Sequence, residues 1–300
     1  MGARLKIFLI FALLWAVFIG IAYGIFYLLL YTGYIPADTS YLWLAMIMVP
    51  ILLIFNLVTY FFSDRMVLAS YNAQIVDERS APRLARIVQR IATQADLPMP
   101  RLAIIPSQTP NAMATGRDAE HAVVAVTEGI LNMLTDEELE GVIGHEMAHV
   151  KDRDILVMTV VASAAAIISI FARMAIYNAM FGGRRSNVNP LVLLGAAIFA
   201  PIAAMMVQLA VSRSREYKAD AQGARITMKP LALARALSKL ESANERRPMQ
   251  FGSSSPAHSS LFIVNPFTGG FFVNLFSTHP PIKARIERLE RMADREGFVQ

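Results

Sequence analysis

Two histidines and a glutamate stand close together in the stretch GVIGHEMAHVKDRD, residues 141–154. If this stretch is an α-helix, His145 and His149 share one face, because residues four apart lie one turn above each other. Both imidazoles can then bind one metal ion. Glu146, about 100° further round the helix, can reach a water molecule beside that ion. The spacing therefore predicts a zinc site of the HExxH type, with two ligands and one general base.

A catalytic zinc site needs a third protein ligand and one position left open for water. The chain has no cysteine, so the third ligand must be a histidine or a carboxylate. The stretch SRSREYKAD offers Glu216 as that ligand and Asp220, four residues later, as the carboxylate that orients a ligand histidine. A solvated helix face, with both carboxylates as partners of Arg213 and Lys218, explains the same pattern nearly as well.

Hydrophobic spacing and capping signals predict the elements that position these side chains. The stretch TDEELEGVIGHEMAHV opens with a capping box from Thr135 to Glu138, which indicates a helix that carries the histidine pair. Short strands are expected at RLAIIP, NAMATG and HAVVAV. Further helices are expected at DERSAPRLARIVQRIATQADLPMP, SRSREYKADAQGARIT, KPLALARALSKLESANE and PIKARIERLERMADRE. The predicted fold is mainly α with a small mixed β-sheet.

Composition points to a membrane protein, since 55% of the residues are hydrophobic and only 17% are charged. Residues 7–30 and 41–62 are uncharged and long enough to span a bilayer as a hairpin. Residues 155–172 and 191–211 form a second apolar pair, joined by a link with three arginines. This second hairpin either violates the positive-inside rule or enters the membrane without crossing it. Two to four transmembrane helices are therefore expected.

The apolar runs divide the chain into four segments. An amino-terminal transmembrane hairpin occupies 1–62, and the first part of a cytoplasmic catalytic domain occupies 63–154. The second apolar hairpin occupies 155–211, and the rest of the catalytic domain occupies 212–300. Basic residues beside apolar spans indicate the cytoplasmic side. A nucleic-acid-binding protein is excluded, because the net charge of +5 is modest and basic residues do not gather with aromatic ones.

HEMAH and SRSREYKAD, together with the two amino-terminal spans, NAMATG and STHPP, resemble the HtpX family. These are bacterial membrane zinc metalloproteases related to the CAAX-prenyl proteases, and the resemblance covers essentially the whole chain. It implies a zincin-like catalytic domain that binds one Zn²⁺ per chain through His145, His149 and Glu216. It also implies Glu146 as the catalytic base and Asp220 as the partner of a ligand histidine.

The resemblance extends to two further stretches. His279, in FSTHPPIKAR, is a candidate donor to the developing oxyanion, although a surface histidine that caps the next helix fits the spacing equally well. NAMATG should form an exposed sheet edge near the metal, where a substrate can add as a strand. Asn111 and Ala112 are the predicted substrate-binding residues. Without the resemblance, Asn111 would be read as an ordinary turn residue.

The metal site is expected at or just under the cytoplasmic membrane surface. His149 lies six residues before the run 155–172, and Glu216 lies five residues after the run 191–211. The apolar stretch 261–276, LFIVNPFTGGFFVNLF, is expected either to lie on the bilayer or gate the cleft, or to be an ordinary buried loop.

The main functional hypothesis is a membrane-bound zinc endopeptidase of a bacterial inner membrane. It would degrade misfolded or damaged membrane proteins, with Glu146 taking a proton from a zinc-polarised water. An intramembrane protease is disfavoured, because the charged TDEELE and KDRD flank the motif and charge is costly in hydrocarbon. A non-catalytic membrane protein with structural zinc is the other alternative, although structural sites usually have four protein ligands.

Overall fold

The computed structural model describes residues 30, 36, 41–156, 158–159, 161, 213–246, 261–264 and 280–297. The chain divides into two units, Met1–Phe62 and Ser63–Gln300. Three of the predicted apolar spans lie largely or wholly outside the described residues. These are 7–30, of which only residue 30 is described, most of 155–172, and all of 191–211. Within the described ranges, no helix combines the length and the apolarity needed to cross a membrane.

Helix α2, Tyr41–Ser70, begins where the second apolar run begins and continues past its end into charged sequence. In the first unit, Ile54, Leu57 and Phe61 lie on one stripe of this helix and are 59, 49 and 48% exposed. In the second unit, by contrast, the last turns of α2 are buried against the sheet. The prediction of a helix from residue 41 is therefore confirmed.

Four strands form one mixed sheet in the order β1-β2-β4-β3. β1 (Gln74–Val76) is antiparallel to β2 (Arg101–Ile105), which is parallel to β4 (Val123–Thr127). β4 is in turn antiparallel to β3 (Ala112–Thr115). The three predicted strands are confirmed. β1 was not predicted, because three residues are too few to show a strand period.

Both faces of the sheet are buried at β3 and β4 and over most of β2, whereas β1 is largely exposed. Alternate strand residues such as Leu102, Ala114 and Val124 belong to the main core, which the helices of the second unit complete. The intervening residues, such as Met113 and Ala125, pack on the other face in a second cluster with the end of α2 and with Leu261 and Phe262. The sheet is therefore a rigid support on which the neighbouring helix and loop residues can be placed.

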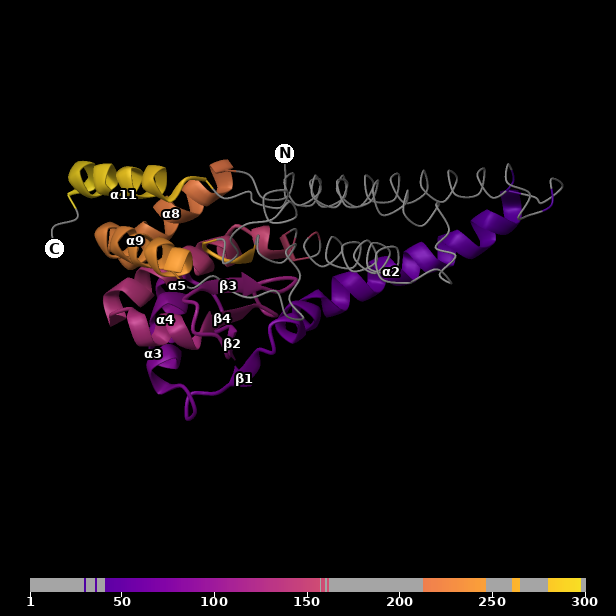
Figure 1. The fold of residues 1–300 in the computed structure, drawn as a ribbon, viewed down its shortest axis with the longest axis horizontal. Coiled ribbons are helices and arrows are strands. Elements are labelled where there is room, and N and C mark those ends of the chain that lie inside the picture. The colour runs from indigo at the N-terminus through magenta and orange to yellow at the C-terminus, as the bar shows by residue number, and fades with distance from the viewer. Residues whose placement is uncertain are drawn as a thin grey trace, which may run out of the picture. The chain divides into compact units, whose positions relative to one another are not determined.

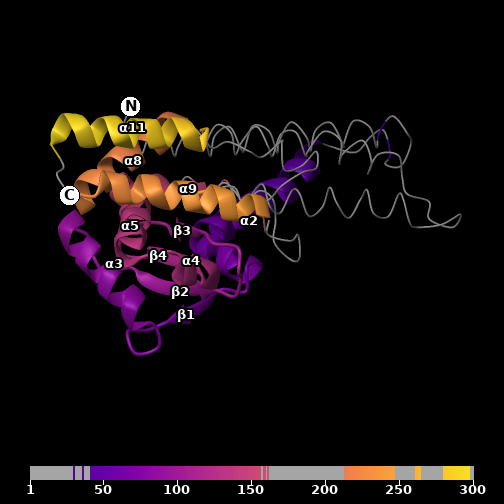
Figure 2. The ribbon, with the colours of Figure 1, turned by 60° about the vertical axis from the view of Figure 1, so that its left-hand side comes forward.

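Six helices accompany the sheet in the described part of the second unit: α3 (Pro82–Ala95), α4 (Glu128–Met133), α5 (Asp136–Lys151), α8 (Arg213–Thr227), α9 (Pro230–Arg246) and α11 (Ile282–Glu296). Helix α5 is central, because it packs against α3, α8, α9 and β3. Figures 1 and 2 show α5 between the strands and the group formed by α8, α9 and α11. The long predicted helices are confirmed, whereas the short α4 was not predicted.

Helix α5 is stabilised at its start and buried along most of its length. Thr135 and Glu138 form the predicted capping box, each side chain accepting a hydrogen bond from the backbone N–H of the other residue. Every residue from Glu138 to Val150 is buried. One buried carboxylate in this range, Glu140, is neutralised by ion pairs with Arg90 and Lys229. The histidine pair thus lies in the interior, where an unpartnered polar group would be costly.

Candidate metal centre and active site

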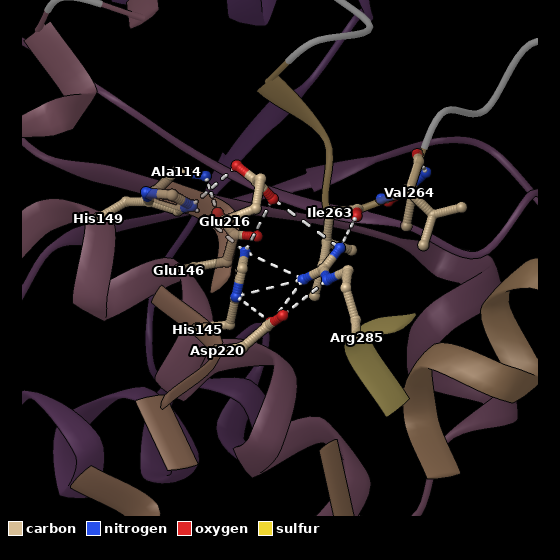
Figure 3. A network of polar contacts seen from close by, with 10 residues as sticks. Ala114, His145, Glu146, His149, Glu216, Asp220, Ile263, Val264 and Arg285 are labelled. Atoms are coloured by element: carbon tan, nitrogen blue, oxygen red, sulfur yellow. Dashed lines mark hydrogen bonds and ion pairs between the residues drawn. The ribbon is translucent and has the colours of Figure 1, made fainter. Parts of the chain in front are cut away.

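Three side chains from two helices converge in the interior of the second unit. His145 and His149 of α5 and Glu216 of α8 each direct one possible ligand atom to a common point (Figure 3). The two Nε2 atoms are 3.3 Å apart. Oε2 of Glu216 lies 3.7 Å from Nε2 of His145, and Oε1 lies 3.6 Å from Nε2 of His149. The spacing predicted the histidine pair, whereas Glu216 as the third ligand was one of two readings of its pattern and was favoured by the family resemblance.

The size and chemistry of this triangle suit a small metal ion. Zinc–nitrogen bonds of about 2.0–2.1 Å at tetrahedral angles separate neighbouring ligand atoms by about 3.3–3.4 Å. The observed separations of 3.3, 3.6 and 3.7 Å are close to that value. Without a cation, the two Nε2 atoms would face each other with at most one proton between them. Two imidazoles and one carboxylate, all buried, therefore form a site that fits a divalent metal ion.

Helices α5 and α8 come close enough to form the triangle because each carries a glycine at the crossing. A Cβ atom on Gly223 would lie 2.6 Å from the backbone nitrogen of His145 and 2.7 Å from the carbonyl carbon of Gly144. A Cβ on Gly144 would meet Thr227 at 2.5 Å. All three distances are shorter than van der Waals contact allows. The two glycines therefore set the distance between the helices that carry the ligands.

Asp220 fixes the orientation of the His145 ring. Its Oδ1 lies 2.9 Å from Nδ1 of His145, which leaves Nε2 directed to the metal position. Asp220 is itself held by Arg285, whose Nε and Nη2 donate to its two carboxylate oxygens at 2.8 and 2.7 Å (Figure 3). Such a two-point ion pair is geometrically specific as well as strong. A chain of contacts thus runs from α11 through α8 to a ligand on α5.

Arg285 was missed by the sequence analysis, although α11 contains a signal for it. The buried residues of this helix are Ile282, Arg285, Leu289 and Ala293, which follow one helical stripe. An arginine on the apolar stripe of an amphipathic helix must be paired inside the protein. Arg285 is fully buried, and burial lowers its pKa, but the facing Asp220 and Glu216 carboxylates outweigh that effect and raise it. It therefore stays charged.

Glu146 lies beside the ligand triangle and is held by the sheet. Its Oε2 accepts a hydrogen bond of 2.7 Å from the backbone N–H of Ala114 in β3. Burial raises the pKa of the Glu146 carboxyl to about 7, and the charge of Glu216 adds to this, whereas His145 opposes it. A carboxyl with a pKa near neutrality is suited to accept and return a proton.

The two imidazoles differ in their protonation. Burial lowers the pKa of His149 to about 4, so its ring is neutral near pH 7 and can act as a ligand. Burial also acts to lower the pKa of His145, but the hydrogen bond to Asp220 raises it and determines the direction of the net shift. For Asp220, burial raises the pKa, and the charge and hydrogen bonds of Arg285 lower it below its ordinary value.

The strand that was expected to receive substrate is an edge strand, but its outer side is in contact with the chain itself. β3 bridges Phe262 through Met113 in antiparallel fashion. The side chain of Asn111 is completely buried and donates from Nδ2 to the carbonyl of Val264 at 2.6 Å. The expectation of an exposed edge is therefore wrong for this structure. Roles for Asn111 and Ala112 in substrate binding remain predictions.

The remaining predicted residues have separate outcomes. The alternative in which Glu216 and Asp220 lie on a solvated helix face is wrong, because they are 1 and 3% exposed. His279 lies outside the described residues, so its role stays a prediction. Of the stretch 261–276, the described residues 261–264 are buried against the sheet, as a buried loop would be.

Comparisons with known proteins agree with this geometry. The model of Peptidase family M48 matches residues 78–293. A Protease HtpX homolog of Thermococcus kodakarensis is 55% identical over 258 residues, which cover 85% of this chain and 88% of the relative. One of Syntrophobacter fumaroxidans is 52% identical over 246 residues, which cover 80% of this chain and 86% of the relative.

Among solved structures, the crystal structure of S. mikatae Ste24p is similar with a TM-score of 0.45 and 18% identity, covering 96% of this chain and 67% of that one. The family match spans β2, β3, β4, α5, α8 and most of α11, and therefore includes every side chain of the ligand triangle. The resemblance to HtpX that the motifs indicated is confirmed by the curated relatives. The chain belongs to peptidase family M48.

Proposed function

We propose that this chain is a zinc-dependent endopeptidase of a cytoplasmic membrane that cleaves misfolded or damaged membrane proteins. The observation that carries the proposal is a buried triangle of two imidazoles and one carboxylate with a second carboxylate, Glu146, beside it. A structural zinc site would need a fourth protein ligand and no base. Among the described residues, the possible ligands at this point are His145, His149 and Glu216.

When bound, zinc would supply positive charge that acidifies a water molecule and polarises a peptide carbonyl. His145 and His149 hold that charge as neutral ligands, and Asp220 keeps the first ring in the tautomer that leaves Nε2 available. Glu146 removes the proton of the attacking water and later delivers it to the leaving amine. Because Oε2 accepts the Ala114 N–H, Oε1 is the oxygen that carries the proton.

Substrate is proposed to bind as an added strand along the outer side of β3, in place of the residues 261–264 that contact this edge in the structure. Ala114 links this strand directly to the base, so a peptide on the same edge lies beside Glu146. Backbone pairing of this kind tolerates many sequences, which suits an enzyme that acts on damaged proteins. Asn111 and Ala112 provide polar backbone and side-chain groups at the start of the edge. His279 is proposed as a further donor to the oxyanion.

The membrane location is proposed from the sequence. Residues 7–30 and 41–62 form two uncharged runs, each long enough to span a bilayer. The exposed apolar stripe of α2 formed by Ile54, Leu57 and Phe61 supports contact with lipid rather than water. A site anchored in this way reaches the loops and ends of membrane proteins, which supports quality control of that class of substrate.

The test is cleavage of an unfolded model protein by the full chain in detergent with zinc. Glu146→Gln is expected to abolish cleavage while the bound zinc per chain stays unchanged, because the base is removed and the ligands are kept. Glu137→Gln is the matched control, since Glu137 is an exposed residue of the same helix. Equal cleavage by the unaltered and the Glu146→Gln chains would refute the proposed mechanism. Zinc binding without cleavage in either chain would favour structural zinc.

A further inference from the structure

A short described segment, Leu261–Val264, lies along the outer side of β3. We refer to this segment as the strap. It bridges β3 between Phe262 and Met113 in antiparallel fashion. This register places Ile263 opposite Ala112 and Leu261 opposite Ala114, the residue that donates its N–H to Glu146. The strap is thus paired to the edge beside the catalytic base.

The backbone of the strap is bound through every polar group of two consecutive residues. The N–H of Ile263 donates to the carbonyl of Ala112 at 3.0 Å, and its carbonyl accepts from Nη1 of Arg285 at 2.8 Å. The N–H of Val264 donates to Oδ1 of Asn111 at 3.4 Å, and its carbonyl accepts from Nδ2 of the same side chain at 2.6 Å. Contacts to backbone alone are how a site holds an extended peptide of variable sequence.

The groups that bind the strap are also connected to the metal site. Arg285 contacts Ile263 with one nitrogen and Asp220 with two others, and Asp220 orients His145 (Figure 3). On the other side, Ala114 joins β3 to Glu146. The strap therefore pairs with the same sheet edge that holds Glu146, and it shares Arg285 with Asp220. A substrate that adds to β3 beside Glu146 needs the same place.

The side chains of the strap occupy apolar surroundings of two kinds. Phe262 is 1% exposed and packs edge-on against Tyr71, with ring centres 4.9 Å apart, in the cluster that includes Met113. Ile263 points into the main core and is also 1% exposed. If the strap leaves, these surroundings become pockets that accept an aromatic residue and then a β-branched aliphatic residue.

We infer that the strap occupies the substrate position of this peptidase, so that it competes with substrate and reveals which peptides the site accepts. The inference rests on the proposed function. The substrate class is an extended apolar peptide with a large aromatic residue followed by a β-branched one, as in strap residues Phe262 and Ile263. A peptide in this class replaces the strap on β3 and takes over its backbone contacts.

A reversible disulfide tests the inference. Met113 and Phe262 form a non-hydrogen-bonded antiparallel pair, in which Cα atoms are about 4.5 Å apart, within the range that a disulfide spans. The chain has no cysteine, so the double variant Met113→Cys, Phe262→Cys contains one pair of thiols. Oxidation locks the strap onto β3, and a phosphine reductant releases it. Each single variant is the control for the effects of the reductant and of the smaller side chain.

Two readouts separate this inference from the proposed function. The first is the binding of a fluorescent peptide containing Leu-Phe-Ile-Val, measured by anisotropy with Glu146→Gln added to the locked pair. The second is cleavage of the unfolded model protein when Glu146 is intact. Oxidation is expected to weaken peptide binding about tenfold or more and to suppress cleavage, because a covalently held strap cannot be displaced. Reduction should restore both.

The possible outcomes differ for the two hypotheses. Peptide binding that follows the redox state without any cleavage would support the inference and count against the proposed function. Cleavage and binding that are equal in the oxidised and reduced states would overturn the inference while leaving the proposed function intact. An absence of peptide binding in the reduced, folded protein would also overturn it, since the edge would then not be a peptide site.

A second pair of variants covers the case in which the double cysteine variant does not fold. Ile263→Pro removes the N–H that donates to Ala112, whereas Ile263→Val leaves the same number of side-chain carbons and keeps that donor. Ile263→Pro is expected to bind the peptide about 3- to 10-fold more tightly than Ile263→Val, the range that one hydrogen bond provides. Equal binding by the two variants would overturn the inference.

Discussion

Gly223→Ala is expected to reduce the metal affinity of this chain sharply. The added Cβ would lie 2.6 Å from the His145 nitrogen and 2.7 Å from the Gly144 carbonyl carbon, both of which are backbone atoms of α5. Carbon atoms make favourable contact at about 3.5–4.0 Å, so α8 must move away from α5 by about 1 Å. Backbone atoms in a buried helix cannot rotate out of the way as the end of a side chain can.

A shift of that size is large compared with the tolerance of the ligand triangle. The three separations, 3.3, 3.6 and 3.7 Å, exceed the separation in a tetrahedral zinc site by at most about 0.4 Å. Moving Glu216 by about 1 Å therefore breaks its contact with an ion held by the two histidines. Residues that merely orient a ligand change affinity 10- to 100-fold, so displacing a ligand should cost about 100-fold or more.

The assay is zinc affinity of the full chain in detergent, measured by competition with a chelating dye. Gly141→Ala is the matched control, because its Cβ would lie 2.8 Å from the nitrogen of Leu233 and so forces α5 away from α9 instead. Both variants should be destabilised by about 1–3 kcal/mol through overpacking, as unfolding in urea without zinc would show. Only Gly223→Ala should lose zinc affinity.

Unchanged zinc affinity in folded Gly223→Ala would refute the conclusion that the glycine crossing sets the ligand geometry. A similar loss in Gly141→Ala would also refute it, because the loss would then follow from general destabilisation. Gly144→Ala should have an intermediate effect, since its nearest obstacle is the Cγ2 methyl group of Thr227, which is part of a side chain.

Three further results are expected at the same site. Asp220→Asn should lower zinc affinity about 10- to 100-fold, because a neutral amide cannot accept hydrogen bonds from both His145 and the buried Arg285 as the carboxylate does. Competition with the chelating dye measures this, and an unchanged affinity would contradict the positioning role. Arg285→Lys should reduce the free energy of unfolding by about 1.5–3 kcal/mol, since lysine cannot form the two-point ion pair with Asp220. Unfolding in urea measures this, and an unchanged midpoint would contradict the prediction. Zinc affinity should fall as the pH drops through the raised pKa of His145, because a proton on the ring competes with the metal ion. In zinc titrations from pH 8 downwards, the fall should be at most about tenfold per pH unit for this one proton. An affinity that does not change with pH would exclude competition by that proton.

Local patterns in the sequence predicted most of the site. The i,i+4 spacing of His145 and His149 and of Glu216 and Asp220 depends only on helix geometry, and the capping box before the first pair indicated that the helix exists. Burial could not be predicted in the same way. The solvated alternative for Glu216 and Asp220 was excluded only by the packing of α8 against α5.

Features that depend on contacts between distant parts of the chain were not predictable from local patterns. Arg285 is 65 residues from its partner Asp220, and Val264 is 153 residues from Asn111. The charge of Arg285 on an apolar stripe could have indicated an internal partner but not which one. The strap carries no turn or motif signal, and its place on β3 follows only from the assembled fold.

The dependence of Asp220 on Arg285 also affects when activity can arise during synthesis. Residues 145–220 emerge from the ribosome well before residue 285, so a growing polypeptide contains the ligands before it contains the arginine that neutralises Asp220. Burying that carboxylate without a counter-charge costs several kcal/mol, which opposes early docking of the two ligand helices. Prematurely terminated chains that lack residue 285 are therefore expected to be inert, so the peptidase becomes competent only late in its own translation.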